Sequence, residues 1–176
     1  MIVEPRLLSK GNDATAMMYQ PGSEGRRVYV ACSRRNPFYD SVVKTVQGSG
    51  WDVYDFKHPP SGPAFNFGEV DAKWYDWTTW QFMNKLRHPR VTSAYDDDKQ
   101  ALDEADYGIL VLPSLSGAYA RAGYLLGKGI PVLAYLPSTV TVEPDLMYKL
   151  FTLPPFGDIM QLLVGLRDLR PAHEHT

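Results

Sequence analysis

The sequence predicts a single three-layer α/β domain, in which a parallel sheet of four to five strands has helices on both faces in the flavodoxin-like or Rossmann-like manner. Residues 109–135 show an apolar run, a Ser/Gly turn, a helix of small residues and a second apolar run. Residues 28–56 repeat this order of strand, loop, helix and strand. Alternating strand and helix patterns of this kind are typical of βαβ units and therefore of a parallel sheet.

The first half of the chain supplies two strands and one helix. Residues 28–32 are β-rich and lead into a polar loop. Pro37 suits the first turn of a helix, because its missing N–H would be unpaired there anyway. Apolar residues then recur at helical spacing until Gly48, and residues 51–56 alternate between apolar and polar as a second strand does.

Residues 57–77 interrupt the pattern with a proline-rich and aromatic-rich loop. A loop of this length in a compact chain is usually functional. Its aromatic side chains either stack on a planar ligand or pack beneath the loop. Thr78 or Thr79 is expected to cap a short helix, and Ser93 is expected to start another. Residues 96–98, all Asp, would then lie near that helix start, where the helix dipole favours negative charge.

The second half supplies two more strands and three helices. Residues 107–112 are almost wholly apolar, which predicts a central strand, and residues 130–136 form the fourth. Between them, Gly123 and Gly127 are spaced to suit close packing of the helix on the sheet. Further on, Pro144 is expected to open one helix and Asp158 to cap the last.

Composition limits the classes of function. The 176 residues carry 18 basic and 20 acidic side chains, so nucleic-acid binding is not expected. One cysteine, Cys32, excludes an internal disulfide and a cysteine-based zinc site, and we expect no metal. No apolar run approaches the length of a membrane span, and the N-terminus lacks a signal-peptide pattern. We therefore expect a cytoplasmic protein that does not bind membranes.

The domain limits follow from the loss of periodicity at both ends. Residues 1–25 are expected to be a flexible arm, or an arm that covers a neighbour's site, residues 26–168 the folded domain, and residues 169–176 a flexible tail. Ligands of parallel α/β sheets lie beyond the carboxyl ends of the strands. Residues 33–36, the aromatic loop and residues 113–117 should meet there. The first of these loops has no glycine, so neither a P-loop nor a dinucleotide motif is present.

An ordered series of short motifs runs through residues 28–166. It comprises Val30–Arg34, Tyr54–Phe56, Glu69–Asp71 with Trp74, Trp77–Phe82, Asp98, Ala105–Asp106, Val111–Ser114, Ser116, Ala122–Tyr124, Gly127–Gly129 and Glu143–Lys149. In order and spacing the series resembles the nucleoside 2-deoxyribosyltransferase-like superfamily, which includes transferases and 2′-deoxynucleotide N-hydrolases. The resemblance implies a cleft that binds a nucleoside or nucleotide and cleaves its N-glycosidic bond through a glutamate nucleophile, in the manner of a retaining glycosidase. It also implies a homo-oligomer.

The resemblance assigns roles to particular positions. Asp98 matches the family's aspartate, and Ser33 and Arg34 lie where the hydrolases bind a 5′-phosphate. Arg121 occupies the position of the nucleophilic glutamate. Together with Ser33 and Arg34, the candidate ligand-binding residues are Phe56, Asp71, Trp74, Pro113, Ser114, Ser116 and Gly117.

Three functions remain open, because an arginine stays protonated and cannot be a nucleophile. The first is a protein that binds a nucleoside, a nucleotide or an ADP-ribose-like molecule without the family's covalent chemistry. The second is an active hydrolase or transferase that uses another carboxylate, for which Glu69 is the candidate. The third is a structural or interaction subunit of a homo- or hetero-oligomer. A rotated helix would instead leave Arg121 on the surface. No cofactor is expected.

Overall fold

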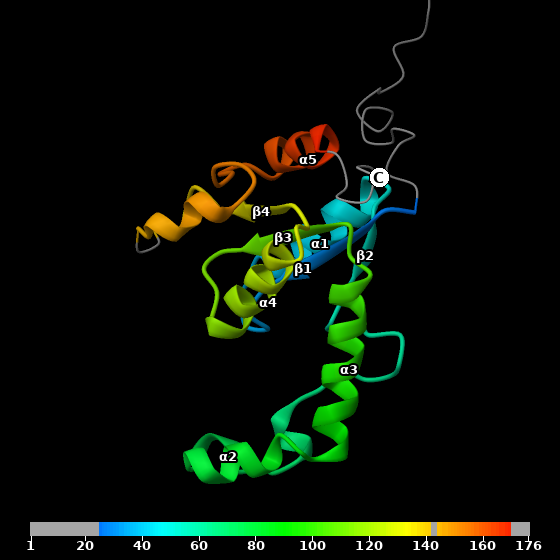
Figure 1. Ribbon diagram of the computed structural model, residues 1–176, viewed down its shortest axis with the longest axis vertical. Coiled ribbons are helices and arrows are strands. Elements are labelled where there is room, and N and C mark those ends of the chain that lie inside the picture. Colours follow the sequence, from blue (N-terminus) through cyan, green and yellow to red (C-terminus); the bar gives the residue numbers. More distant parts are fainter. Residues whose placement is uncertain (1–24, 142–143, 170–176) are drawn as a thin grey trace, which may run out of the picture.

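The computed structural model describes residues 25–141 and 144–169, which contain one four-stranded sheet (Figure 1). The strands are β1 (Arg27–Ala31), β2 (Asp52–Tyr54), β3 (Tyr107–Val111) and β4 (Val132–Tyr135). All of them are parallel, and their order is β2-β1-β3-β4. The predicted fold class is therefore confirmed, with four strands in the described part of the chain.

Helices cover both faces of this sheet. The longer ones are α1 (Tyr39–Gly48), α3 (Pro89–Asp103), α4 (Ser116–Gly127) and α5 (Ile159–Asp168). α1 and α5 pack on the face to which Val28 and Val30 point. α4 and the end of α3 pack on the opposite face, with Tyr29 and Ala31. Because successive strand residues point to opposite faces, β1 contributes to both hydrophobic cores.

β3 lies at the centre of the sheet, and all five of its residues are buried, as its apolar sequence predicted. A Cβ at Gly108 would lie 2.7 Å from Leu125 Cδ1 on α4 and 3.0 Å from Val132 Cγ2 on β4. This glycine is therefore the close-packing position between helix and sheet. The same role predicted for Gly123 and Gly127 is wrong, since both are exposed and a Cβ there would meet nothing within 4 Å.

The helix caps confirm part of the sequence analysis. Thr78 caps α2 (Thr79–Lys85) by accepting a hydrogen bond from Gln81 N–H, and Asp158 caps α5. Pro144 does not open an α-helix, because the segment that follows is the 3₁₀ helix η3 (Leu146–Leu150), capped by Asp145.

The start of α3 differs from the prediction. The helix begins at Pro89, and the ring of His88 accepts a hydrogen bond from Arg90 N–H, so Ser93 lies in its second turn. Proline is well placed at a first helical position because it has no N–H to leave unpaired. Residues 96–98 consequently lie in the middle of α3, and the expected stabilisation by the helix dipole is wrong.

Residues 63–95 form a lobe that projects from the body of the protein (Figure 1). The lobe contains the 3₁₀ helices η1 (Phe67–Glu69) and η2 (Trp74–Asp76), α2 and the first turns of α3. The Phe67 ring lies 4.9 Å from that of Phe65 and 5.7 Å from that of Trp77, measured between centroids. Of the two roles weighed for these aromatics, the structure supports packing against one another.

The segments at the two ends fall outside this description. The arm predicted at residues 1–25 and the tail predicted at residues 169–176 lie outside the described residues, apart from Gly25 and Leu169. Among the helices of residues 25–141 and 144–169, none has the length and apolar character needed to cross a membrane.

Replacing Gly108 with alanine tests the tight contact between α4 and the sheet. The added methyl group must displace the buried Leu125 or the β-branched Val132, so we expect Gly108→Ala to lower the free energy of unfolding by about 2 kcal/mol. Gly123→Ala, on the exposed side of α4, should raise it by up to about 1 kcal/mol. Urea unfolding measures both, and a Gly108→Ala midpoint equal to that of the wild type would contradict the packing argument.

Candidate functional site

The sheet topology creates a crevice at the carboxyl ends of β1 and β3. These strands are hydrogen-bonded neighbours, but the chain leaves β1 for α1 on one face and leaves β3 for α4 on the other. The two connecting loops therefore diverge and leave space between them. Crevices of this kind are where parallel α/β proteins bind their ligands.

Hydrogen bonds tie the two loops together at the base of the crevice. The buried side-chain amide of Asn36 donates to the carbonyl of Pro113 (2.7 Å). The hydroxyl of Ser114 accepts from Ser33 N–H (3.0 Å) and donates to the carbonyl of Val111 (2.8 Å). Ser33 and Ser114, both predicted to contact ligand, thus hold the loops in place.

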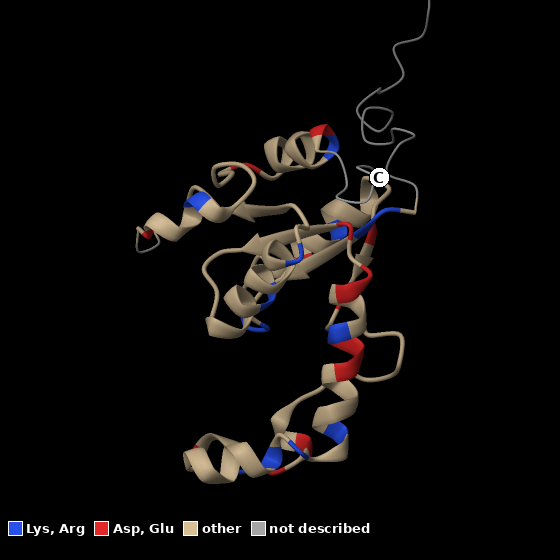
Figure 2. Cartoon of the chain, in the orientation of Figure 1, with Lys and Arg blue, Asp and Glu red and all other residues tan. Residues whose placement is uncertain are grey.

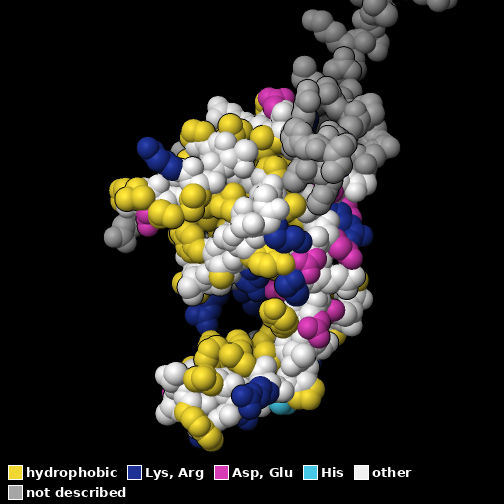
Figure 3. Space-filling model, in the orientation of Figure 1, with side chains coloured by type: hydrophobic (Ala, Val, Ile, Leu, Met, Phe, Trp, Pro, Cys, Tyr) yellow, Lys and Arg dark blue, Asp and Glu magenta, His cyan; other side chains and the backbone are white. Residues whose placement is uncertain are grey.

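The lobe forms the opposite side of this crevice, and we call the space between lobe and body the cleft. Figure 3 shows an open gap there, with Lys or Arg side chains and hydrophobic side chains at its edges. Arg34 and Arg35 are exposed after β1, and Arg34 donates a hydrogen bond to the carbonyl of Phe65 in the lobe. The three segments predicted to converge therefore do so.

The N-terminus of α4 opens toward the same end of the sheet. Leu115 is the N-cap residue and provides no side-chain hydrogen bond, while Ser116 and Gly117 in the first turn are exposed. The first backbone N–H groups of a helix lack internal partners and carry partial positive charge. This helix end can therefore receive an anion.

An ion pair connects the two helices beside the crevice. Arg121 Nη2 on α4 lies 2.5 Å from Asp98 Oδ2 on α3, and the two side chains are 33% and 18% exposed. Figure 2 shows acidic residues along the half of α3 that is next to the body. Arg121 thus lies against Asp98 and is not a freely exposed surface residue.

Two tyrosines lie next to the ion pair. Tyr29 on β1 pairs in register with Tyr54 on β2, and their rings stack with centroids 5.7 Å apart. Burial is the main reason that the pKa of each hydroxyl is raised, with Asp98 raising it further and Arg121 opposing the rise. Burial alone would lower the pKa of Arg121, but Tyr29 and Asp98 raise it, so the guanidinium stays charged.

The Tyr29 hydroxyl is buried and has no hydrogen-bond partner among the described residues. Buried polar groups almost always have a partner, and Asp98, which raises the pKa of this hydroxyl, is the neighbouring acceptor. Strand alternation could have located Tyr29 and Tyr54, because residues 29 and 31 face α4, but the register between β1 and β2 is not visible in the sequence. Asn36 was predicted to be near the site only as part of the loop of residues 33–36, and its hydrogen bond to Pro113 was not foreseen.

The carboxylates of the lobe are engaged in its own structure. Glu69 Oε1 accepts from Asn66 N–H and Oε2 from Arg90 Nε, both at 2.9 Å. Asp71 accepts from Trp77 Nε1 and Lys73 N–H, and these bonds lower its pKa. Neither carboxylate has a hydrogen bond to Asp98 or Arg121 within the described part of the chain.

Two residues that were predicted to contact a ligand, Trp74 and Phe56, lie against other aromatic side chains. Trp74 is 37% exposed and packs near Phe67 in the lobe. Phe56 lies against Tyr39 at a centroid distance of 4.5 Å, on the face of the sheet that α1 covers. Phe56 therefore belongs to the opposite core from the ion pair.

In the described part of the chain, the cysteine and the metal-binding residue types add no reactive group to the site. Cys32 is buried, and burial raises the pKa of its thiol to about 11, so it is protonated at neutral pH. Within residues 25–141 and 144–169, no three His, Cys, Asp or Glu side chains are placed to hold a metal ion.

Comparison with known proteins supports the fold. No protein-family model and no curated protein matches the sequence. Among solved structures, the chain is similar to a 2-deoxyribosyltransferase from Bacillus psychrosaccharolyticus. The match has a TM-score of 0.50 and 15% identity, and it covers 82% of this chain and 98% of that one. At this identity, the likeness concerns the fold.

The tyrosine hydroxyls make stability sensitive to alkaline pH. The pKa of Tyr29 is raised in the folded state, so folding favours the protonated phenol. This contribution to the free energy of unfolding is complete below the unfolded pKa of about 10 and is lost as the pH rises above that value. We expect Tyr29→Phe to be as stable as the wild type at pH 7, because it removes an unpaired hydroxyl, and to lose less stability between pH 9 and 11. Urea unfolding across this range measures both slopes, and parallel slopes would contradict the assignment.

Proposed function

We propose that the cleft binds a nucleoside or a nucleotide and that the chain does not carry out covalent glycosyl transfer. The observation that carries this proposal is the ion pair between Arg121 and Asp98. A glycosidase-like double displacement needs a carboxylate that attacks the anomeric carbon. Arg121, at the position that the resemblance assigns to that carboxylate, is a protonated guanidinium with no lone pair to offer.

The charges around the crevice favour a ligand with an anionic group. Arg34 and Arg35 are exposed beside it, and the uncapped N-terminus of α4 opens toward the same end of the sheet. Arginine and helix N-termini are the groups that proteins commonly use to hold phosphates. A 5′-nucleotide or an ADP-ribose-like molecule therefore suits the site better than an uncharged nucleoside.

Two further features are consistent with this ligand. The unpaired hydroxyl of Tyr29 offers a hydrogen bond next to Arg121, suited to a sugar hydroxyl. The solved structure that this chain resembles is a 2-deoxyribosyltransferase, and the match covers 98% of that protein's chain.

Hydrolysis through Glu69 has less support. Both of its oxygens are bonded within the lobe, to Asn66 N–H and to Arg90. A general base must be within hydrogen-bond reach of the water that it activates. Glu69 would therefore have to break its contact with Arg90 before it could act.

Thermal and chemical unfolding with a panel of ligands tests the binding proposal. The panel contains AMP, dAMP, ADP-ribose and the matching nucleosides. A ligand present at 100 times its dissociation constant should raise the free energy of unfolding by about 2.7 kcal/mol. Arg121→Met should weaken nucleotide binding about tenfold, whereas Arg167→Met on α5 should leave it unchanged. Failure of every nucleotide to stabilise the protein would overturn the proposal.

A base-release assay with the same panel tests whether the chain cleaves the N-glycosidic bond. We expect no free base from the wild type, because no glutamate occupies position 121. Base release by the wild type that Glu69→Gln abolishes would instead establish the hydrolase alternative. Base release by Arg121→Glu alone would support a pocket that lacks only its nucleophile.

We also propose that the chain associates with itself through the lobe. Trp80 is 74% exposed and Met83 61% exposed on α2, and exposed apolar patches of this kind mark interaction surfaces. Light scattering should give a mass of at least twice 19.8 kDa for the wild type. Trp80→Ser with Met83→Ser should lower it, while Val164→Ser, at an exposed apolar residue of α5, should not. A monomeric wild type would contradict this proposal.

A further inference from the structure

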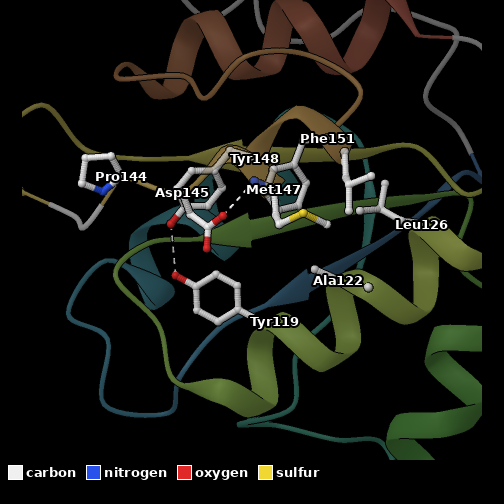
Figure 4. A pocket seen from close by; sticks show the side chains of 10 residues that line it. Tyr119, Ala122, Leu126, Pro144, Asp145, Met147, Tyr148 and Phe151 are labelled. Carbon is white, nitrogen blue, oxygen red and sulfur yellow. Dashed lines mark hydrogen bonds between the residues drawn. The ribbon is translucent and has the colours of Figure 1, made fainter.

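A second pocket lies on the other flank of α4, between this helix and η3 (Figure 4). Its volume is about 400 Å³, which is within the range of small-molecule sites. It is lined by Tyr119, Ala122, Gly123, Leu126, Pro144, Asp145, Met147, Tyr148, Leu150 and Phe151. Gly123 and Arg121 are about 160° apart around the helix axis, so the pocket is separate from the ion pair with Asp98.

Oxygen atoms gather at one end of this pocket. The hydroxyls of Tyr119 and Tyr148 lie 3.3 Å apart, and burial raises the pKa of Tyr119, so the hydroxyl is protonated at neutral pH. Asp145 Oδ1 accepts from Met147 N–H at 2.8 Å. Its Oδ2 has no hydrogen-bond partner in residues 25–141 and 144–169. Figure 4 shows the carboxylate close to the two hydroxyls.

Apolar groups form the other end. Figure 4 shows Ala122 and Leu126 on the side of the pocket away from Tyr119 and Asp145, with the side chain of Met147 between the two sides. The ring of Phe151 stacks with that of Tyr148 at a centroid distance of 5.8 Å and provides a flat wall. A Cβ at Gly123 would meet nothing within 4 Å, so the absence of a side chain keeps this part of the pocket open.

The charge of the lining decides which ligands fit. Among the lining residues that the structure describes, Asp145 is the one formally charged side chain, and none is Lys or Arg. A carboxylate and two hydroxyl oxygens next to an apolar wall match a cationic nitrogen on an apolar body. A phosphate or carboxylate ligand would instead meet the Asp145 carboxylate without a compensating cation.

We propose that this pocket binds a protonated primary amine carried on a flat apolar group. The ammonium would donate hydrogen bonds to Asp145 Oδ2 and to a tyrosine hydroxyl, while the ring lies between Leu126 and Phe151. The site does not depend on the proposed nucleotide function, because it lies on the other flank of α4 and has the opposite charge preference.

Isothermal titration at low ionic strength with phenethylamine tests the proposal. A ligand of this size should bind with a dissociation constant of about 1 mM. The neutral 2-phenylethanol and the anionic 3-phenylpropionate should each bind at least about fivefold more weakly, since they lack the pairing with the carboxylate. Equal affinity for the amine and the alcohol, or no binding of the amine at about 20 mM, would overturn the proposal.

Matched variants locate the binding. Asp145→Asn should weaken phenethylamine binding about fivefold and yet keep the cap of η3, because asparagine caps as well as aspartate does. Asp158→Asn, which changes the cap of α5 outside the pocket, should leave it unchanged. Equal affinities for these two variants would contradict the role of Asp145.

A second pair of variants tests whether the open space beside Gly123 is needed for binding. Gly123→Leu should abolish amine binding without loss of stability, since the side chain enters the pocket and meets no atom near its Cβ. Gly127→Leu, equally unobstructed but outside the lining, should bind as the wild type does. Arg121→Met should also retain amine binding, so failure of the nucleotide proposal and failure of this one are distinguishable.

Discussion

The pairing of β1 with β3 is the constraint on which the rest of the molecule depends. These two strands hold the centre of the sheet, and the chain leaves them toward opposite faces, so their loops must part at the carboxyl end. Asn36 and Ser114 then tie the parted loops at the base. The crevice is thus a product of strand order, and the side chains around it only determine what enters.

α4 divides the molecule electrostatically. One flank carries Arg121 against Asp98, with a buried tyrosine hydroxyl beside them. The other flank faces the carboxylate of Asp145 across a mostly apolar pocket. A helix made largely of small residues allows both arrangements, because it leaves room on either side. The proposed site for a nucleotide anion and the proposed site for an amine cation therefore lie on two flanks of the same helix.

Helix caps were predicted correctly from short stretches of the sequence. Thr78 and Asp158 cap helices as predicted, because a cap depends on residues within one turn. The helix containing the three consecutive aspartates was misplaced, since Pro89 begins it one turn earlier than expected. Strand alternation indicates the face on which Tyr29 and Tyr54 lie, but not their stacking, because that contact depends on the register between β1 and β2. The prediction that Gly123 and Gly127 face the sheet failed for a similar reason, because the side of α4 that packs on the sheet depends on distant contacts.

The lobe is built around its own aromatic cluster and projects at the end of α3 (Figure 1). With 15 residues, α3 is about 22 Å long. A helix of this length acts as a lever, so a tilt of about 10° at the sheet moves the far end by about 4 Å. The hydrogen bond from Arg34 to the Phe65 carbonyl ties the body to the lobe near the end of α3 that is far from the sheet, since Arg90 in the first turn of α3 lies over the Phe65 ring. The width of the cleft therefore depends on the angle of α3 and on this hydrogen bond, and substitutions at the sheet end of the helix would change the size of ligand admitted without touching any residue that binds it.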